Sequence, residues 1–152
     1  MSYRNVEYER DRNNYPLINF PVIYDRNEPG LIASGSIEFA DEDNLTIEKK
    51  TSVITLTKAA IHPDNLFLLA IEKPTDNTAG DLTINVYNVI KIDGVNERDV
   101  LHAILTVEAI TNSATYRDFL IQGLFVGGGI KLGAKFASDS GAITIHWKLY
   151  RL

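Results

Sequence analysis

The sequence has no cysteine among its 152 residues. This absence excludes disulfide bridges, thiolate nucleophiles and cysteine-ligated zinc together. Long apolar runs are also missing, since the longest is the six-residue stretch 66–71 and a membrane-spanning helix needs about 20 apolar residues. The charged residues 1–10 lack the apolar core of a signal peptide. We therefore expect no disulfide, no membrane partner and a soluble chain.

An excess of basic residues is absent as well. The formal net charge is −5 and the isoelectric point is near 5.1, whereas binding to a nucleic-acid backbone needs a basic face. The chain therefore predicts no nucleic-acid partner. The apolar share of 45% and the charged share of 23% are ordinary for a globular protein, and the length fits one domain.

Metal-ligating patterns are scarce. The three histidines lie far apart in the sequence, and the only carboxylate cluster is 41–43. An EF-hand loop starting there would need glycine at its sixth position and glutamate at its twelfth, but Thr46 and Ser52 occupy them. We predict a solvated acidic loop, no metal site and no cofactor.

Two glycine-containing segments suggest chemistry and fail on their context. Gly128 and Gly133 have the spacing of a phosphate-binding loop, but Ala134 stands where that loop has its lysine. The Asp-Ser-Gly triplet 139–141 lacks the glycine two residues before its serine that an oxyanion hole of the trypsin type needs, because Ser138 is there. We predict no catalytic residue and a protein that is not an enzyme.

The strongest positive signal is the alternation of apolar and polar residues near the C-terminus. It runs over 130–136 and again over 143–149, with the turn-forming residues 138–141 between the two stretches. A period of two is typical of a half-buried strand, and short polar residues with glycine favour turns. The pattern predicts a β-hairpin.

Similar patterns recur along the chain. Strands are predicted over 31–40, 45–57 (one bent strand or two short ones), 66–72, 82–89 and 119–126. Residues 100–110 fit both a strand and, after a helix-cap-like segment 96–99, a helix; we favour the strand. The fold class predicted is all-β, an antiparallel two-sheet sandwich of jelly-roll-like type, with a closed barrel as the alternative.

The N-terminus differs from the rest. Four of the seven tyrosines fall in the first 24 residues, and Pro16 and Pro21 favour an extended backbone. We predict an extended N-terminal arm, 1–24, before a single domain, 25–152; a disordered terminus or an edge strand on its own domain is the alternative. Tyrosine is enriched in protein interfaces. The partner-binding residues predicted are Tyr3, Tyr8, Tyr15, Leu17, Ile18, Phe20, Val22, Ile23 and Tyr24.

A small acidic β domain (31–152) behind a tyrosine-rich arm (3–24) resembles, in layout, the head-decoration or cement proteins of tailed bacteriophages. The resemblance implies a non-catalytic virion protein on the capsid surface. It also implies a homo-oligomer, favouring a trimer, that binds the major capsid protein or other shell subunits. If the chain is not encoded by a phage, we expect a soluble cytoplasmic protein. A carbohydrate- or ligand-binding β-sandwich module is the alternative, and a small β-barrel enzyme is the third reading.

Overall fold

The computed structural model describes residues 30–56, 66–74, 79–108, 115–123 and 125–152. The described residues form nine β-strands and no helix. Their bounds are β1 Gly30–Phe39, β2 Lys49–Lys50, β3 Ile54–Thr55, β4 Leu66–Lys73, β5 Leu82–Ile90, β6 Arg98–Val107, β7 Thr115–Gln122, β8 Gly129–Phe136 and β9 Ile143–Arg151. No helix in the described part of the chain is long and apolar enough to cross a membrane.

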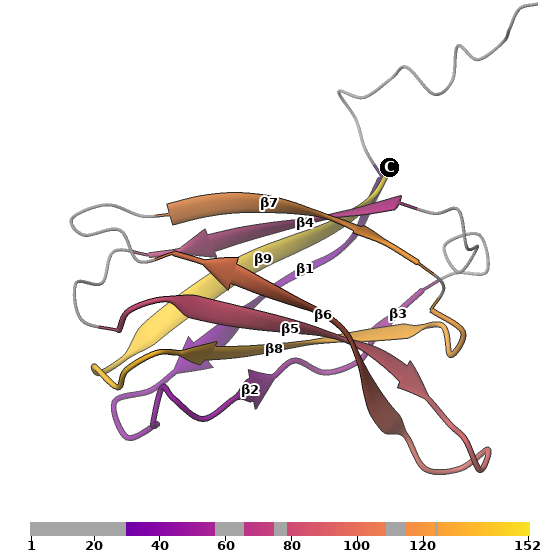
Figure 1. Ribbon diagram of the computed structural model, residues 1–152, viewed down its shortest axis with the longest axis horizontal. Helices are drawn as coiled ribbons and strands as arrows, with labels where there is room; N and C mark the ends of the chain where they lie inside the picture. Colours follow the sequence, from indigo (N-terminus) through magenta and orange to yellow (C-terminus); the bar gives the residue numbers. More distant parts are fainter. Residues whose placement is uncertain (1–29, 57–65, 75–78, 109–114, 124) are drawn as a thin grey trace, which may run out of the picture.

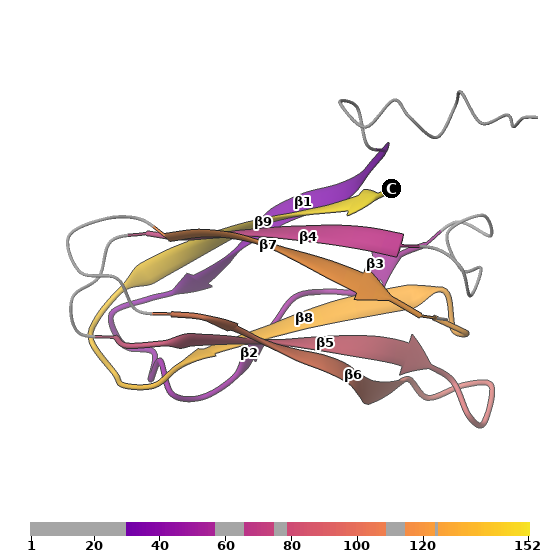
Figure 2. The same cartoon turned by 45° about the horizontal axis from the view of Figure 1, so that its top comes forward.

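The strands form two antiparallel sheets. Sheet A has the order β1-β9-β4-β7, and sheet B has the order β2-β8-β5-β6, with β3 also pairing with β8. Figures 1 and 2 show the two sheets as separate layers, one above the other. The pairs are nested: β5 pairs with β6, β4 with β7, β2 and β3 with β8, and β1 with β9. This arrangement is a jelly roll, so the predicted fold class is confirmed.

Alternating side chains fill the space between the sheets. In β4, Phe67, Leu69 and Ile71 are buried, and the residues between them are only half-buried. The strands β5 and β9 alternate in a similar way, and β8 does so except at its buried glycines. Such alternation is the signature of a strand with one face in the core. Lys73 is the exception. Its side chain is fully buried, and its Nζ, 5.8 Å from the ring centroid of Phe136, has no hydrogen-bond partner among the described residues.

The predicted C-terminal hairpin is wrong. Both strands exist, but β8 belongs to sheet B and β9 to sheet A, so the two strands face each other across the core. The turn between them is a corner that passes from one sheet to the other. Gly141 has a φ of 86° there, and the Asp139 carboxylate accepts a hydrogen bond from the backbone N–H of Leu45 at 3.0 Å. Alternation shows that a strand has one buried face, but not which sheet it joins.

Two other predictions are refined. The ambiguous segment 100–110 is a strand, β6, up to Val107. Of the helix-cap-like residues 96–99, Arg98 and Asp99 already belong to β6. Asn96 lies in the preceding turn, where the Asp93 carboxylate accepts hydrogen bonds from the backbone N–H groups of Val95 and Asn96. The strand predicted over 119–126 starts earlier and ends at Gln122, and a loop with a positive φ at Gly128 follows.

The first and last strands lie side by side. Gly30 pairs with Arg151 at one end of the β1–β9 ladder, and Phe39 pairs with Ile143 at the other. The backbone N–H of Leu152 donates to the carbonyl of Leu66 at 2.9 Å. The point where residues 1–29 join the domain therefore lies beside the C-terminus and the start of β4 (Figure 1).

Candidate functional site

The outer face of sheet A carries a group of polar and aromatic side chains held in rows by the strand register. Glu72 on β4 lies opposite His146 on β9 and opposite Tyr116 on β7. One step along, Ala70 lies between Lys148 and Asp118. Directly paired residues point to the same face of a sheet. Two rows of residues from three strands that are distant in the sequence therefore meet on one surface.

These rows line a shallow hollow of about 550 Å³. Its floor is low because Ala70, in the middle of the second row, has only a methyl group. The other lining residues include Ser34, Ser36, Glu72, Tyr116, Asp118, His146, Lys148 and Tyr150. The depression therefore follows from small residues placed among large polar ones.

Two tyrosines border the hollow. Tyr116 is 68% exposed, and Tyr150 on β9 is half-buried. They are two strands apart, about 10 Å, and four residues apart along the strands, about 13 Å. A tyrosine offers an apolar ring with a polar tip. Tyr116, the more exposed of the two, is therefore the aromatic surface that a ligand in the hollow would contact.

The polar side chains of the hollow are not engaged with one another. Across the described residues, no hydrogen bond or ion pair involves the side chains of Glu72, Asp118, His146 or Lys148. Folded proteins normally pair such groups when burial makes pairing necessary, but here the face is open to solvent. The donors and acceptors are therefore available to a ligand.

The outer face of sheet B is different, because its polar groups bind each other. The Glu48 carboxylate accepts hydrogen bonds from Asn85 Nδ2 at 2.8 Å and from the Tyr87 hydroxyl at 2.6 Å. Burial, and then the hydrogen bond to Glu48, raises the pKa of Tyr87 to about 12. The Glu48 side chain reaches these partners by crossing β8 at Gly133, where a Cβ atom would collide with its carboxylate.

A second cluster on sheet B is also satisfied internally. The Asp99 carboxylate lies 2.8 Å from Lys50 Nζ and 3.4 Å from Lys131 Nζ. The hydrogen bond from Lys50 is the main reason that the pKa of Asp99 is lowered. The same Lys50 ammonium lies 4.3 Å from the centroid of the Tyr87 ring. The network stabilises the sheet and leaves few free groups for a ligand.

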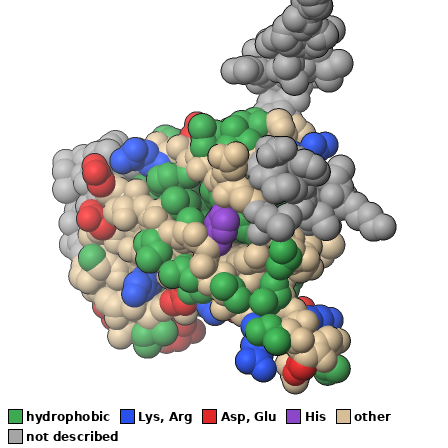
Figure 3. Space-filling model, turned by 45° about the vertical axis from the view of Figure 1, so that its right-hand side comes forward, with side chains coloured by type: hydrophobic (Ala, Val, Ile, Leu, Met, Phe, Trp, Pro, Cys, Tyr) green, Lys and Arg blue, Asp and Glu red, His purple; other side chains and the backbone are tan. Residues whose placement is uncertain are grey.

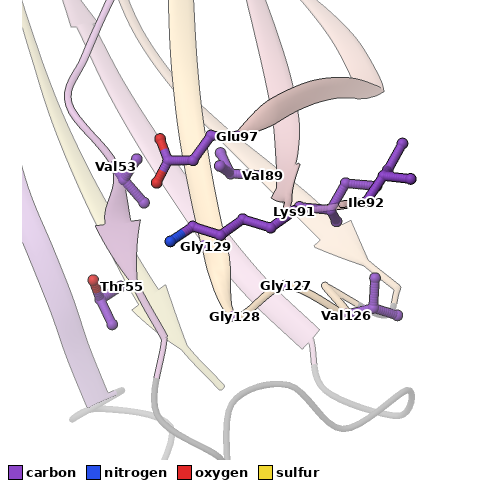
Figure 4. A pocket seen from close by; sticks show the side chains of 11 residues that line it. Val53, Thr55, Val89, Lys91, Ile92, Glu97, Val126, Gly127, Gly128 and Gly129 are labelled. Carbon is purple, nitrogen blue, oxygen red and sulfur yellow. The ribbon is translucent and has the colours of Figure 1, made fainter. Parts of the chain in front are cut away.

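A second hollow, of about 580 Å³, lies at the end of sheet B (Figure 4). The side chains of Lys91 and Glu97 flank it from the β5–β6 connection, and residues 126–129 form one wall. At Gly127 a Cβ atom would collide with the carbonyl oxygen of Val89. The glycines are therefore required for close passage of the backbone. Both charged side chains are exposed, so this hollow is a weaker candidate than the one on sheet A.

No group of three or more His, Asp or Glu side chains in the described ranges is arranged to hold a metal ion. In the acidic loop 41–43, Asp43 forms an ion pair with Lys49 at 2.6 Å, and this hydrogen bond is the first cause of the lowered pKa of Asp43. The cation beside the Asp43 carboxylate is therefore the ammonium group of Lys49.

The predicted partner-binding residues, Tyr3, Tyr8, Tyr15, Leu17, Ile18, Phe20, Val22, Ile23 and Tyr24, all lie outside the described residues. The structure brings together a set that the sequence did not single out, centred on Glu72, Tyr116 and His146. In sequence these three residues are 30 or more positions apart, and only the strand register unites them. The sequence pattern that could have pointed to this site is the alternation in 143–149, which places Lys148 and Tyr150 on the outer face.

Comparisons with known proteins give little guidance. No protein family and no curated protein matches the sequence. Among solved structures, the chain is similar to TmCBM61 in complex with β-1,4-galactotriose, with 17% identity over 80% of this chain and 66% of that one, and a TM-score of 0.36. It is also similar to the Yersinia pseudotuberculosis-derived mitogen, with 14% identity over 81% and 86% and a TM-score of 0.33. This chain thus spans just under two thirds of the first structure. Both scores are too low to bear on the ligand.

Proposed function

We propose that the protein is a non-catalytic binding module that holds a short oligosaccharide on the outer face of sheet A. The observation that carries the proposal is a set of polar side chains, without partners among the described residues, beside the exposed Tyr116. Jelly rolls occur among lectin domains as well as viral capsid proteins. Because one fold serves many functions, the site and not the fold supports the proposal.

The charges of the hollow favour a neutral ligand rich in hydroxyl groups. Glu72 and Asp118 carry acceptors only, and Lys148 carries donors only. A sugar hydroxyl can donate to the first two and accept from the third. A polyanion would meet two carboxylates, and a polycation would meet the lysine. The ring of Tyr116, which is 68% exposed, provides apolar surface for the face of a sugar ring.

The proposal is tested by screening the full chain on a glycan array and measuring the affinity of any ligand by calorimetry. We expect Tyr116→Ala and Glu72→Ala each to weaken binding about tenfold, which corresponds to about 1.4 kcal/mol. Lys148→Ala should also weaken it. Its matched control is Lys135→Ala on the exposed outer side of β8, which should leave the affinity unchanged. Absence of any bound glycan, or binding indifferent to all three changes, would refute the proposal.

A second candidate function is the virion role suggested by the layout of the sequence. The observation that favours it is the exposure of large apolar side chains: Ile92 is 72% exposed, Val95 74%, Ile104 61% and Val126 61%. Ile92 and Val126 line the same hollow at the end of sheet B. Figure 3 shows hydrophobic side chains exposed on one face of the molecule and on the projecting lobe at lower right. Exposed apolar side chains that gather on a surface are typical of protein–protein contacts.

The virion role predicts that the protein co-purifies with intact virus particles and forms a stable trimer in light scattering after gel filtration. Deletion of residues 1–24 should then reduce the trimer to monomers. A monomer that is unaffected by this deletion and absent from particles would exclude the role.

A further inference from the structure

One end of the outer face of sheet A is apolar, in contrast to the polar hollow beside it. Leu31, Tyr150, Leu68 and Leu120 form a row across β1, β9, β4 and β7, because each lies opposite the next. Leu66 and Leu152 extend the row by one step. We refer to Leu31, Leu66, Leu68, Leu120, Tyr150 and Leu152 as the apolar end.

The described residues leave this surface partly uncovered. Leu31 is 56% exposed, Leu120 64% and Leu152 51%. Strand β4 is apolar on both faces at this end, since Phe67 and Leu69 enter the core while Leu66 and Leu68 point outward. An antiparallel strand with one solvated face normally alternates apolar with polar residues, and a strand covered on both faces does not. The sequence of β4 therefore indicates a covering layer.

We propose that residues 16–24 of the same chain lie across the apolar end. This segment, Pro-Leu-Ile-Asn-Phe-Pro-Val-Ile-Tyr, is the most apolar part of the 29 residues that precede Gly30. It joins the domain at the surface in question, because Gly30 begins β1 and the next residue, Leu31, already belongs to the apolar end.

The lengths agree with this assignment. The apolar end crosses four strands, which is about 14 Å. Five residues, 25–29, separate the segment from Gly30 and reach up to about 17 Å, and the nine residues of the segment reach about 30 Å when extended. The chain can therefore leave β1, reverse and cross the whole surface. The segment lies on the face of a sheet and adds no strand, so Pro16 and Pro21 need not donate ladder hydrogen bonds.

The same chain is favoured over a second copy because the connection is short. A short linker raises the local concentration of its attached segment to about the millimolar range. A second copy would have to reach that concentration to compete for the surface. If residues 16–24 are held in this way, residues 1–15 are the part of the predicted arm that is left to contact another protein. The inference does not depend on the proposed oligosaccharide site.

Paramagnetic labelling can test the proposal on the full chain. The protein has no cysteine, so Asn19→Cys creates a single site for a nitroxide and keeps Leu17, Ile18 and Phe20 in place. In a 15N-enriched, labelled sample we expect the amide signals of Leu66, Leu68 and Leu120 to lose most of their intensity. The signals of Asn85 and Lys135 on the other sheet should be retained.

A mixed sample separates the same chain from a second copy. It combines unenriched protein that carries the nitroxide with 15N-enriched protein that does not, and its signals should be unchanged. Loss of signal in the mixed sample would show a second copy on the surface, and no loss in the first sample would show that the segment lies elsewhere; either result overturns the proposal.

Two substitutions on the surface complete the test. Leu68→Lys places a charge in the apolar end without entering the core, so it should restore the lost signals. Thr144→Lys, which is on the same outer face of sheet A but away from the apolar end, should not restore them. The amide spectrum itself reports whether each variant is folded. Signal loss that survives Leu68→Lys would contradict the assignment.

Discussion

Replacing Gly133 by alanine should destabilise the protein for a reason that lies outside the strand itself. A Cβ atom at this position would collide with the Glu48 carboxylate, which crosses β8 there. The backbone φ of Gly133 is not among the positive values, so alanine itself fits the strand. The collision forces Glu48 away from Asn85 and Tyr87, its two hydrogen-bond donors.

The expected magnitude follows from two opposing effects. A hydrogen bond to a charged group contributes about 1.5–3 kcal/mol. Both donors are half-buried and can bind water instead, so we count the two bonds together as one, about 1.5–3 kcal/mol. Replacing glycine by alanine stabilises by about 0.4–1 kcal/mol through the unfolded state. The net loss is about 1–2 kcal/mol, or a decrease in Tm of about 2–8 °C for a chain of this size.

A double-mutant cycle with Glu48→Ala is the decisive assay. Without the Glu48 side chain there is nothing for the new methyl group to displace, so Gly133→Ala should become neutral or stabilise by about 0.4–1 kcal/mol. Denaturant unfolding of the four proteins measures each step. If Gly133→Ala destabilises equally in both backgrounds, the reasoning is refuted, because the cost would then lie in the backbone.

Three further predictions concern single side chains. The pKa of Tyr87 is raised to about 12, so its contribution to stability is present below about pH 10 and is lost as the pH rises from there to about 12. The free energy of unfolding, measured against pH, should show this loss in the natural sequence and not in Tyr87→Phe. Parallel pH profiles for the two proteins would contradict the prediction. Lys73→Met should stabilise by about 1–2 kcal/mol, because it removes a buried amine without a described hydrogen-bond partner; a lower denaturation midpoint would show that the amine is satisfied. Gly35→Ala would place a Cβ 2.9 Å from Cζ2 of Trp147, so the fluorescence of this single, buried tryptophan should shift to longer wavelength; an unchanged spectrum would mean that the indole can move aside.

Much of the fold could be predicted because alternation is a local property. In β1, β5, β8 and β9, the apolar residues of each strand predict its buried face without reference to other strands. The pairing of strands is not local. The segment 138–141 suits a turn, but the same residues serve a hairpin or a corner between sheets. The sequence therefore predicted the last two strands correctly and their partner wrongly.

The candidate site could not be predicted for a related reason. Glu72, Tyr116 and His146 acquire their relation only through the register of β7, β4 and β9. None of them stands in a motif, and Tyr116 looks like any exposed aromatic residue in a strand. Conversely, Glu48 and Tyr87 look equally polar in the sequence, and only the structure shows that they satisfy each other and leave sheet A as the available face.

The nesting of the strand pairs also bears on how the chain reaches its final form. The innermost pair, β5 with β6, closes a loop of seven residues, 91–97, whereas Gly30 must find Arg151 across almost the whole chain. Contacts between residues that are distant in sequence form slowly, because the entropy of closing the loop is lost before the contact is gained. We expect the pairs to form from the inside outward, with β1 and β9 last. Since both the hollow and the apolar end span β9, the ability to bind would arise in the final step of folding.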